Sequence, residues 1–237
     1  MNIFNTSKDF LEPQQLVESY YQRQLPTPPQ GFPNGWMSPN DLSLLYNVAF
    51  QATGHVLEVG PWLGRSTTAL AMGLRDREKM GEESVSFDTI DFGITSAEEW
   101  KEKFGEKLNL GKQNGSGADA AYDPGGTRGV LSQNIQNNRL LPFVSHFIRG
   151  DFIDCPISRR YNVIFCDTTH DDAEIERTLP ALAKLAGPGC TFVFDDVITY
   201  QRAEKICGYL DTKTYFMTSH VFPDRKKFCK VMLVTTH

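Results

Sequence analysis

The stretch His55-Val-Leu-Glu-Val-Gly-Pro-Trp-Leu-Gly-Arg-Ser-Thr-Thr68 decides the fold class of this chain. It opens with a short apolar run that ends in an acid, Glu58. A turn with glycines at Gly60 and Gly64 follows, and a helix is expected to start at Ser66-Thr67. Open α/β sheets form a nucleotide-sized pocket where a buried strand feeds a glycine turn and a helix N-terminus. The stretch therefore predicts an α/β sheet with a ligand pocket at this turn.

The spacing of the turn narrows the ligand chemistry. Its Glu-x-Gly-x-x-x-Gly pattern differs from the Gly-x-Gly-x-x-Gly of a pyrophosphate binder, and no Gly-Lys-Ser/Thr follows as in a triphosphate P-loop. An acid in the turn suits a ligand that is cationic or amine-bearing and has no phosphate, and S-adenosylmethionine fits that description. The alternative is a tight strand–helix turn whose glycines serve packing alone. The candidate cofactor contacts are Glu58, Gly60, Gly64, Ser66 and Thr67.

Composition bounds the class of protein. At 237 residues and 40% hydrophobic content the chain can bury the core of one large domain. A net charge of −5 argues against nucleic acid as the main partner. Five cysteines without a Cys-x-x-Cys pair predict reduced thiols and a cytoplasmic location. No signal peptide is evident, and no apolar run approaches the ~18 residues of a membrane span.

Strands and helices alternate from residue 55 onward. The alternation predicts right-handed crossovers and a parallel sheet covered on both faces. Two further strands with no helix between them predict an antiparallel hairpin at the C-terminus. The expected strands are 55–60, 85–91, 144–149, 161–167, 190–196, 214–217 and 230–234, and the expected helices are 66–77, 97–108, 130–140, 171–186 and 199–210.

Two regions lie outside this alternation. Residues 1–36 predict a helical arm, with an amphipathic helix over 9–25, followed by a Pro-rich linker. The main domain is placed at 37–237, with a helix starting at Ser38-Pro39. The arm could cover the site or a partner subunit, which leaves a homo-oligomer open. The Gly-rich residues 109–129 predict either a mobile lid or a disordered insertion.

Acids at two strand ends are candidates for binding the nucleoside. Asp91 closes the second strand, where a carboxylate accepts hydrogen bonds from ribose hydroxyls in doubly wound folds. Asp88 is its competitor but lies in mid-strand. Asp151, after the third strand, could accept from an adenine amino group, with Phe152 against the ring. The alternative for this pair is an ordinary helix cap followed by a core aromatic.

The later strand ends carry the most specific chemistry. Asp167 and the pair Asp195-Asp196 end strands expected to be neighbours, so three carboxylates converge and repel unless a cation lies between them. Oxygen ligands suit a hard ion such as Mg²⁺. The alternative is that the pair caps the next helix and Asp167 bonds locally. His170 lies at the mouth of the same site and is a natural proton acceptor.

From about residue 37 to its end the chain resembles the class I S-adenosylmethionine-dependent methyltransferases. Residues 58–67 look like their first motif, and Asp91, Gly150-Asp151-Phe152 and the terminal hairpin follow in the family's order. Within the class, residues 165–170 and 194–196 look most like metal-dependent O-methyltransferases of sugars and natural products. Those relatives read Ile-Asp-Gly-Asp-His and Phe-Asp-Asp at these places. Their second acid, the proposed base in some of them, is Thr169 here, so that role falls to His170.

The resemblance implies a Rossmann-like, doubly wound, seven-stranded mixed sheet with an antiparallel last strand. It implies methyl transfer from S-adenosylmethionine to a hydroxyl of a small molecule, with Asp167 and His170 catalytic and Mg²⁺ on Asp167, Asp195 and Asp196. Two alternatives stay open. One is a metal-free methyltransferase with His170 as sole base. The other is a protein that binds an adenosine ligand without catalysis, or one that uses a nicotinamide, against which the missing Gly-x-Gly-x-x-Gly argues.

Overall fold

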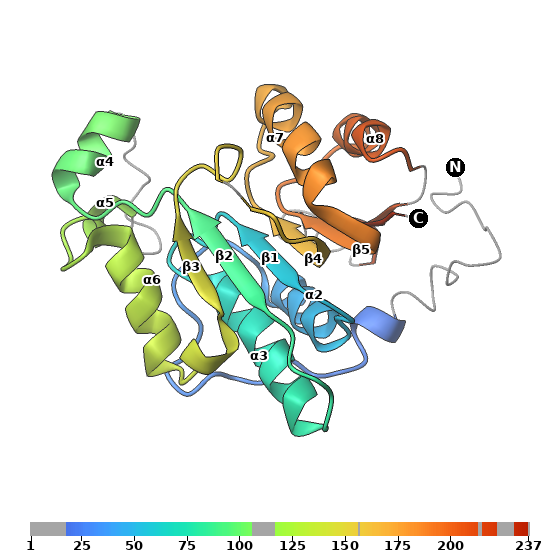
Figure 1. The fold of residues 1–237 in the computed structure, drawn as a ribbon, viewed down its shortest axis with the longest axis horizontal. Helices are drawn as coiled ribbons and strands as arrows, with labels where there is room; N and C mark the ends of the chain where they lie inside the picture. The colour runs from blue at the N-terminus through green and yellow to red at the C-terminus, as the bar shows by residue number, and fades with distance from the viewer. Residues whose placement is uncertain (1–17, 106–116, 156, 213–214, 222–229, 237) are drawn as a thin grey trace.

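The computed structural model describes residues 18–105, 117–155, 157–212, 215–221 and 230–236. They contain a seven-stranded sheet in the order β3-β2-β1-β4-β5-β7-β6 (Figure 1). The strands are β1 (Val56–Val59), β2 (Phe87–Asp91), β3 (His146–Arg149), β4 (Tyr161–Cys166), β5 (Ala186–Phe194), β6 (Tyr215–Met217) and β7 (Met232–Thr235).

The strand directions confirm the predicted mixed sheet. The first five strands are parallel, and β7 runs antiparallel to both β5 and β6. Strand β1 has β2 on one side and β4 on the other, so the chain reverses its direction of winding there, which is where ligands bind in such sheets. One detail of the prediction is wrong: a short helix, α9 (Thr218–Val221), follows β6 where no helix was expected.

Helices cover both faces of the sheet (Figure 1). Strand residues alternate between the two faces, as the period of a strand requires: Val163 and Phe165 point into one core, and Ile164 into the other. The helices packed on the first face are α2 (Pro39–Phe50), α3 (Arg65–Lys79) and α6 (Gly126–Asn137). Those on the second face are α7 (Asp172–Leu185) and α8 (Tyr200–Tyr209).

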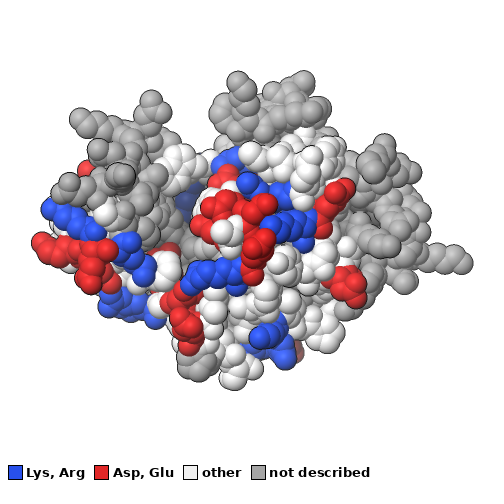
Figure 2. Space-filling model, turned by 90° about the horizontal axis from the view of Figure 1, so that it is seen from above, with Lys and Arg blue, Asp and Glu red and all other residues white. Residues whose placement is uncertain are grey.

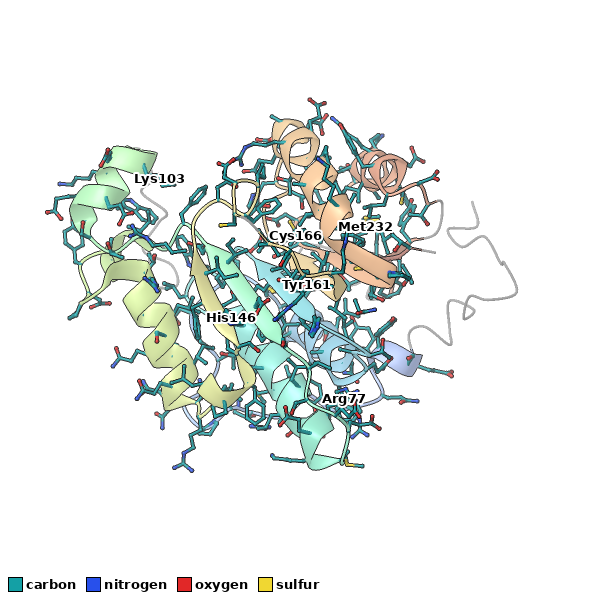
Figure 3. All side chains as sticks on the ribbon, in the orientation of Figure 1. Arg77, Lys103, His146, Tyr161, Cys166 and Met232 are labelled. Carbon is teal, nitrogen blue, oxygen red and sulfur yellow. The ribbon has the colours of Figure 1, made fainter. Side chains whose placement is uncertain are left out.

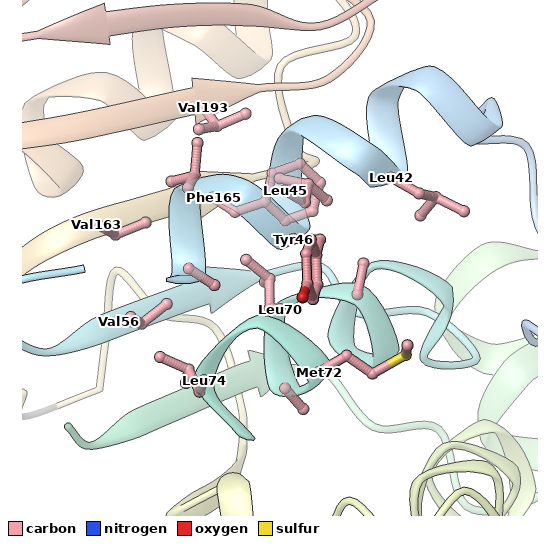
Figure 4. Close-up of a cluster of buried hydrophobic side chains, with 14 of the residues drawn as sticks. Leu42, Leu45, Tyr46, Val56, Leu70, Met72, Leu74, Val163, Phe165 and Val193 are labelled. Atoms are coloured by element: carbon pink, nitrogen blue, oxygen red, sulfur yellow. The ribbon is translucent and has the colours of Figure 1, made fainter. Parts of the chain in front are cut away.

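The first core holds α2 tightly against α3 and the sheet (Figure 4). A side chain at Gly73 would come within 2.3 Å of the backbone oxygen of Tyr46, so glycine is what lets these two helices approach. Helix α2 starts as predicted: the Ser38 hydroxyl accepts from the amide of Asp41, and Pro39 occupies the first turn. This packing fixes α3, whose N-terminus follows the glycine turn.

The insertion after β2 is partly helical. It contains α4 (Ala97–Phe104) and α5 (Gly117–Ala120), and α6 starts at Gly126 rather than near residue 130. Part of the predicted lid, residues 106–116, lies outside the described residues, as do residues 9–17 of the predicted helix 9–25. Residues 18–20 are helical but 21–25 are not, so the prediction is wrong at its C-terminal end. Among the described residues, no helix has the length and apolar character needed to cross a membrane. The boundary after residue 36 stays a prediction.

Candidate active site

The turn after β1 depends on its glycines. Gly60 and Gly64 have φ values of 85° and 93°, in the left-handed region that favours glycine. A Cβ on Gly60 would lie 3.0 Å from the backbone oxygen of Asp167, so the turn lies directly against the end of β4. Gly64 is also the N-cap residue of α3. Helix α3 therefore starts at Arg65, one residue before the predicted start at Ser66-Thr67, because the left-handed Gly64 ends the turn.

Glu58 lies under this turn rather than in it. Its side chain is fully buried, and its carboxylate accepts hydrogen bonds from the hydroxyls of Ser66 (2.6 Å), Thr67 (2.7 Å) and Thr89 (2.9 Å). Burial raises the pKa of Glu58 to about 7, against the lowering effect of the three hydroxyls. These contacts tie β1 to α3 and β2 and so shape the turn. Direct contact of Glu58, Ser66 and Thr67 with a cofactor stays a prediction.

Asp91 lies at the end of β2, as predicted, beside the glycine turn. Its Oδ1 accepts from the amide of Gly93 at 2.7 Å, and desolvation raises its pKa. It lines a crevice, called here the Asp91 crevice, whose volume of about 10 Å³ is room for about one water molecule. The other lining residues include Trp62, Thr89, Thr127, Arg128 and Arg149.

Three tryptophan rings lie in contact at the glycine turn. The ring of Trp62 lies 5.9 Å from that of Trp36 and 5.9 Å from that of Trp100, the latter edge-on. Trp100 belongs to α4 and is 6% exposed, packed with Ile94 and Ala121. The insertion therefore rests on the glycine turn. The three tryptophans lie far apart in the chain, so their contact is not visible in the sequence.

Asp88, the competitor of Asp91, has a different set of partners. Its buried carboxylate contacts Nδ1 of His146 at 2.6 Å, the hydroxyl of Tyr161 at 2.7 Å and the guanidinium of Arg159 at 3.1 Å. His146 and Tyr161 come from β3 and β4, on either side of the β2–β1 pair (Figure 3). Both oxygens of Asp88 are thus held by side chains of the protein, so Asp91 remains the candidate for ribose.

Asp151 and Phe152 have protein partners as well. Asp151 accepts from the amide of Ile153 at 3.1 Å and forms an ion pair with Arg177 of α7. Phe152 is 7% exposed and packs in the second core. This arrangement matches the packing alternative for Phe152, and an adenine contact at this pair stays a prediction.

The predicted carboxylates and the histidine do come together. Asp167 follows β4, Asp195 and Asp196 follow β5, and these strands are parallel neighbours with Cys166 opposite Phe194. Nε2 of His170 lies 3.3 Å from Oδ1 of Asp167 and 3.6 Å from Oδ2 of Asp196. We call Asp167, Asp195 and Asp196 the acidic cluster.

The three acids of the cluster are not equivalent. Asp195 is 4% exposed, and its Oδ1 accepts a hydrogen bond from the backbone amide of Asp196 at 2.8 Å. Burial, together with Asp167 and Asp196, raises the pKa of Asp195 to about 8. Asp196 has a left-handed φ of 58°. Among the residues that the structure describes, the possible ligand atoms that lie within 4.8 Å of one another belong to Asp167, His170 and Asp196, with His170 in place of the predicted Asp195.

Two partners of this site were missed from sequence. Glu174, in the first turn of α7, contacts Nδ1 of His170 at 2.8 Å and accepts its backbone amide at 2.7 Å. Their i,i+4 spacing was the available signal. Lys230 forms an ion pair with Asp196. This ion pair depends on how β7 pairs with β5, which the sequence does not reveal.

The hydrogen bond that the protonated ring donates to Asp167 raises the pKa of His170 to about 9, and Glu174 adds to the rise while desolvation opposes it. The imidazole is half-exposed, so it is open to a substrate. The site thus offers an oriented imidazole beside the glycine turn, mostly protonated at pH 7, whose neutral form can accept a proton.

Comparison with known proteins agrees with this geometry. Residues 57–197, more than half of the chain, match a family model described as a methyltransferase domain. The chain belongs to this methyltransferase family. The matched region runs from β1 to just past Asp196, so it spans the glycine turn and the acidic cluster. No curated protein matches the sequence.

Solved structures share the fold of this methyltransferase domain. The O-methyltransferase TomG from Streptomyces achromogenes, solved with SAM, is 15% identical, with 94% of this chain and 89% of that chain covered at a TM-score of 0.54. An O-methyltransferase from Bacillus cereus, solved with SAH, is 16% identical, with 94% and 90% covered at a TM-score of 0.53. At such identities the likeness concerns the fold.

Proposed function

We propose that this methyltransferase transfers a methyl group from S-adenosylmethionine to a hydroxyl of a small molecule. The observation that carries the proposal is the contact between the glycine turn and the end of β4: Gly60 lies against the backbone of Asp167, and Asp167 lies 3.3 Å from His170. A donor held at the turn and a base for the acceptor are thus adjacent. TomG and the Bacillus cereus enzyme, O-methyltransferases solved with SAM and SAH, support the choice of donor and of oxygen as acceptor.

The cofactor would take the crevice between β1 and β2. Backbone groups of Gly60 and Gly64 would approach its amino acid part, and Asp91 would accept from its ribose hydroxyls. Glu58, with Ser66 and Thr67, would hold the turn in shape beneath it. Asp151 and Phe152 are the proposed adenine contacts.

The reaction would be an in-line displacement. The acceptor oxygen forms a bond to the methyl carbon, the sulfur keeps the electrons of the broken bond, and Nε2 of His170 takes the hydroxyl proton. Glu174 at Nδ1 holds the ring, and Asp167 stabilises the imidazolium that results. Most of the rate enhancement would come from positioning the two reacting atoms.

A version assisted by Mg²⁺ is the second candidate. It is favoured by the ligand atoms of Asp167, His170 and Asp196, which lie within 4.8 Å of one another. A bound divalent ion supplies orientation of the acceptor hydroxyl and a lower pKa for it. In this version His170 is a ligand and Asp195, which is buried, only supports the set. Activity that is unchanged by a chelator would exclude it.

The surface agrees with a small acceptor. Figure 2 shows acidic side chains gathered over the middle of one face, with Lys and Arg side chains among and beside them rather than in a basic stripe. A nucleic-acid substrate favours a basic stripe. The cytoplasmic location and a homo-oligomer stay predictions.

The decisive experiment has two parts. Calorimetry with S-adenosylhomocysteine and with NAD is expected to detect binding of the first alone. A panel of hydroxylated small molecules with isotope-labelled S-adenosylmethionine is then expected to yield a labelled ether or ester product. Preference for NAD would contradict the proposed cofactor. Tight nucleoside binding without turnover on any acceptor would point to the non-catalytic alternative.

A further inference from the structure

We infer that Lys230 supplies the positive charge that holds the acidic cluster together, so that the cluster is complete without a divalent ion. Three converging carboxylates repel one another unless positive charge lies among them. Besides the His170 ring, which contacts Asp167 and Asp196, the chain provides the ammonium of Lys230, just before β7. The inference concerns this site but does not depend on which reaction the protein catalyses.

The position of Lys230 is fixed by the sheet. The antiparallel register between β5 and β7 pairs Phe194 with Met232. Two residues before Met232, the backbone oxygen of Lys230 accepts from the amide of Val197 at 2.9 Å, one residue out of that register, with the left-handed Asp196 on the β5 side of the shift. This backbone hydrogen bond holds Lys230 beside Asp196 at the end of the β5–β7 pair.

The side chain of Lys230 completes the contact. Its ammonium forms an ion pair with Oδ1 of Asp196, and its side chain is 24% exposed, against 30% for that of Asp196. The ammonium also interacts electrostatically with Asp195 and Asp167, so it acts on all three acids. A partly buried pair is screened by salt much less than a surface pair. Solvent and salt therefore screen the attraction between Lys230 and the acidic cluster only partly.

A divalent ion would have to compete with this arrangement. Mg²⁺ on Asp196 would take a carboxylate that Lys230 already holds, and His170 would have to give up its contacts with Asp167 and Asp196 to act as a ligand. Mg²⁺ also requires near-ideal octahedral geometry. The double positive charge of Mg²⁺ would also repel the Lys230 ammonium at this short distance. Lys230 therefore opposes metal binding, and its ammonium neutralises the negative charge of the carboxylates in place of a metal ion.

The test compares Lys230→Met with a matched control, Lys205→Met. Lys205 also bridges two acids, Asp172 (3.3 Å) and Glu176 (2.7 Å), and is 27% exposed, but it lies between α7 and α8. The readouts are Tm with chelator or with MgCl₂, and calorimetric titration with Mg²⁺. Neither needs methyl transfer, so failure of this inference is distinguishable from failure of the proposed function.

Wild type, Lys205→Met and the charge-conserving Lys230→Arg are expected to keep the same Tm with chelator as with Mg²⁺. Lys230→Met is expected to have a lower Tm in chelator, to regain it with Mg²⁺, and to bind the ion about tenfold more tightly or better. Stoichiometric Mg²⁺ binding by wild type with loss of Tm on chelation would overturn the inference, and this result does not depend on any variant folding. A Lys230→Met protein with wild-type Tm and wild-type Mg²⁺ affinity would overturn it too.

Discussion

Nε2 of His170 lies 3.3 Å from Oδ1 of Asp167, at the point where β4 ends and the glycine turn passes. Because the opposite ring nitrogen is held by Glu174 at 2.8 Å, the imidazole has one orientation relative to the proposed donor site.

Replacing His170 by Asn should remove the proton acceptor and leave the fold intact, since the ring is half-exposed. We expect kcat to fall about 10²- to 10⁴-fold, with unchanged affinity for S-adenosylhomocysteine. His146→Asn is the matched control, because His146 also pairs with an aspartate, Asp88, but away from the site. Equal losses of kcat in both variants would argue against His170 as the base.

The rate should rise with pH. The pKa of His170 is raised to about 9 by Asp167, so the neutral imidazole that accepts a proton is the minor form at pH 7. We expect kcat to increase up to about pH 9 and then level off, and Asp167→Asn to move this midpoint downward because it removes the main cause of the rise. A pH–rate profile under saturating substrate measures both. A flat profile between pH 7 and 9 would count against the assignment.

Gly60→Ala should block the turn. Gly60 has φ 85°, and its Cβ would meet the backbone oxygen of Asp167 at 3.0 Å. Gly81 has φ 89° with nothing within 4 Å, so Gly81→Ala carries the same left-handed cost of about 1–2 kcal/mol without the clash. Calorimetry with S-adenosylhomocysteine should show lost affinity for Gly60→Ala alone. Equal affinity in the two variants would remove the turn from the cofactor site.

Asp91→Asn should weaken cofactor binding, because it removes the charge that accepts from the ribose and keeps an oxygen for the amide of Gly93. A hydrogen bond to a charged group contributes about 1.5–3 kcal/mol, which corresponds to a loss of affinity of about tenfold to hundredfold. The exposed Asp154→Asn is the control. An unchanged Kd for S-adenosylhomocysteine in Asp91→Asn would refute the ribose contact.

Glu58 should make stability depend on pH. Its pKa in the fold is about 7 against an ordinary value of 4.5, so the folded state binds this proton more tightly than the unfolded chain. The stability that it contributes is fully present below pH 4.5 and is lost as the pH rises through 7. The difference in free energy of unfolding between wild type and Glu58→Gln should fall over that window, by up to about 3 kcal/mol.

Urea unfolding at several pH values measures this difference. Glu102→Gln, on the exposed side of α4, is the control and should run parallel to wild type. Parallel curves for Glu58→Gln and wild type would show that the buried carboxylate does not titrate in this range.

Local patterns predicted most elements but missed some of their boundaries. Strand β5 starts at Ala186 rather than near 190, although Gly187, Pro188 and Gly189 are turn formers. The reason is tertiary: Ala186 pairs with Tyr161 across a register shift in β4. Helix α6 begins earlier than predicted, where the left-handed Gly125 caps it. Neither pairing nor capping by a left-handed residue is visible in hydrophobic periodicity.

The sequence by itself determined the alternating α/β order, the glycine turn after β1 and the acids at the strand ends, because alternation and glycine conformation are local properties. Only the tertiary structure decided which groups meet. Glu58 finds Thr89 on another strand, Trp62 meets Trp100 from the insertion, and Lys230 reaches Asp196. These contacts depend on strand order, on register and on the packing of distant segments, and each of these is set by burying both faces of the sheet at once.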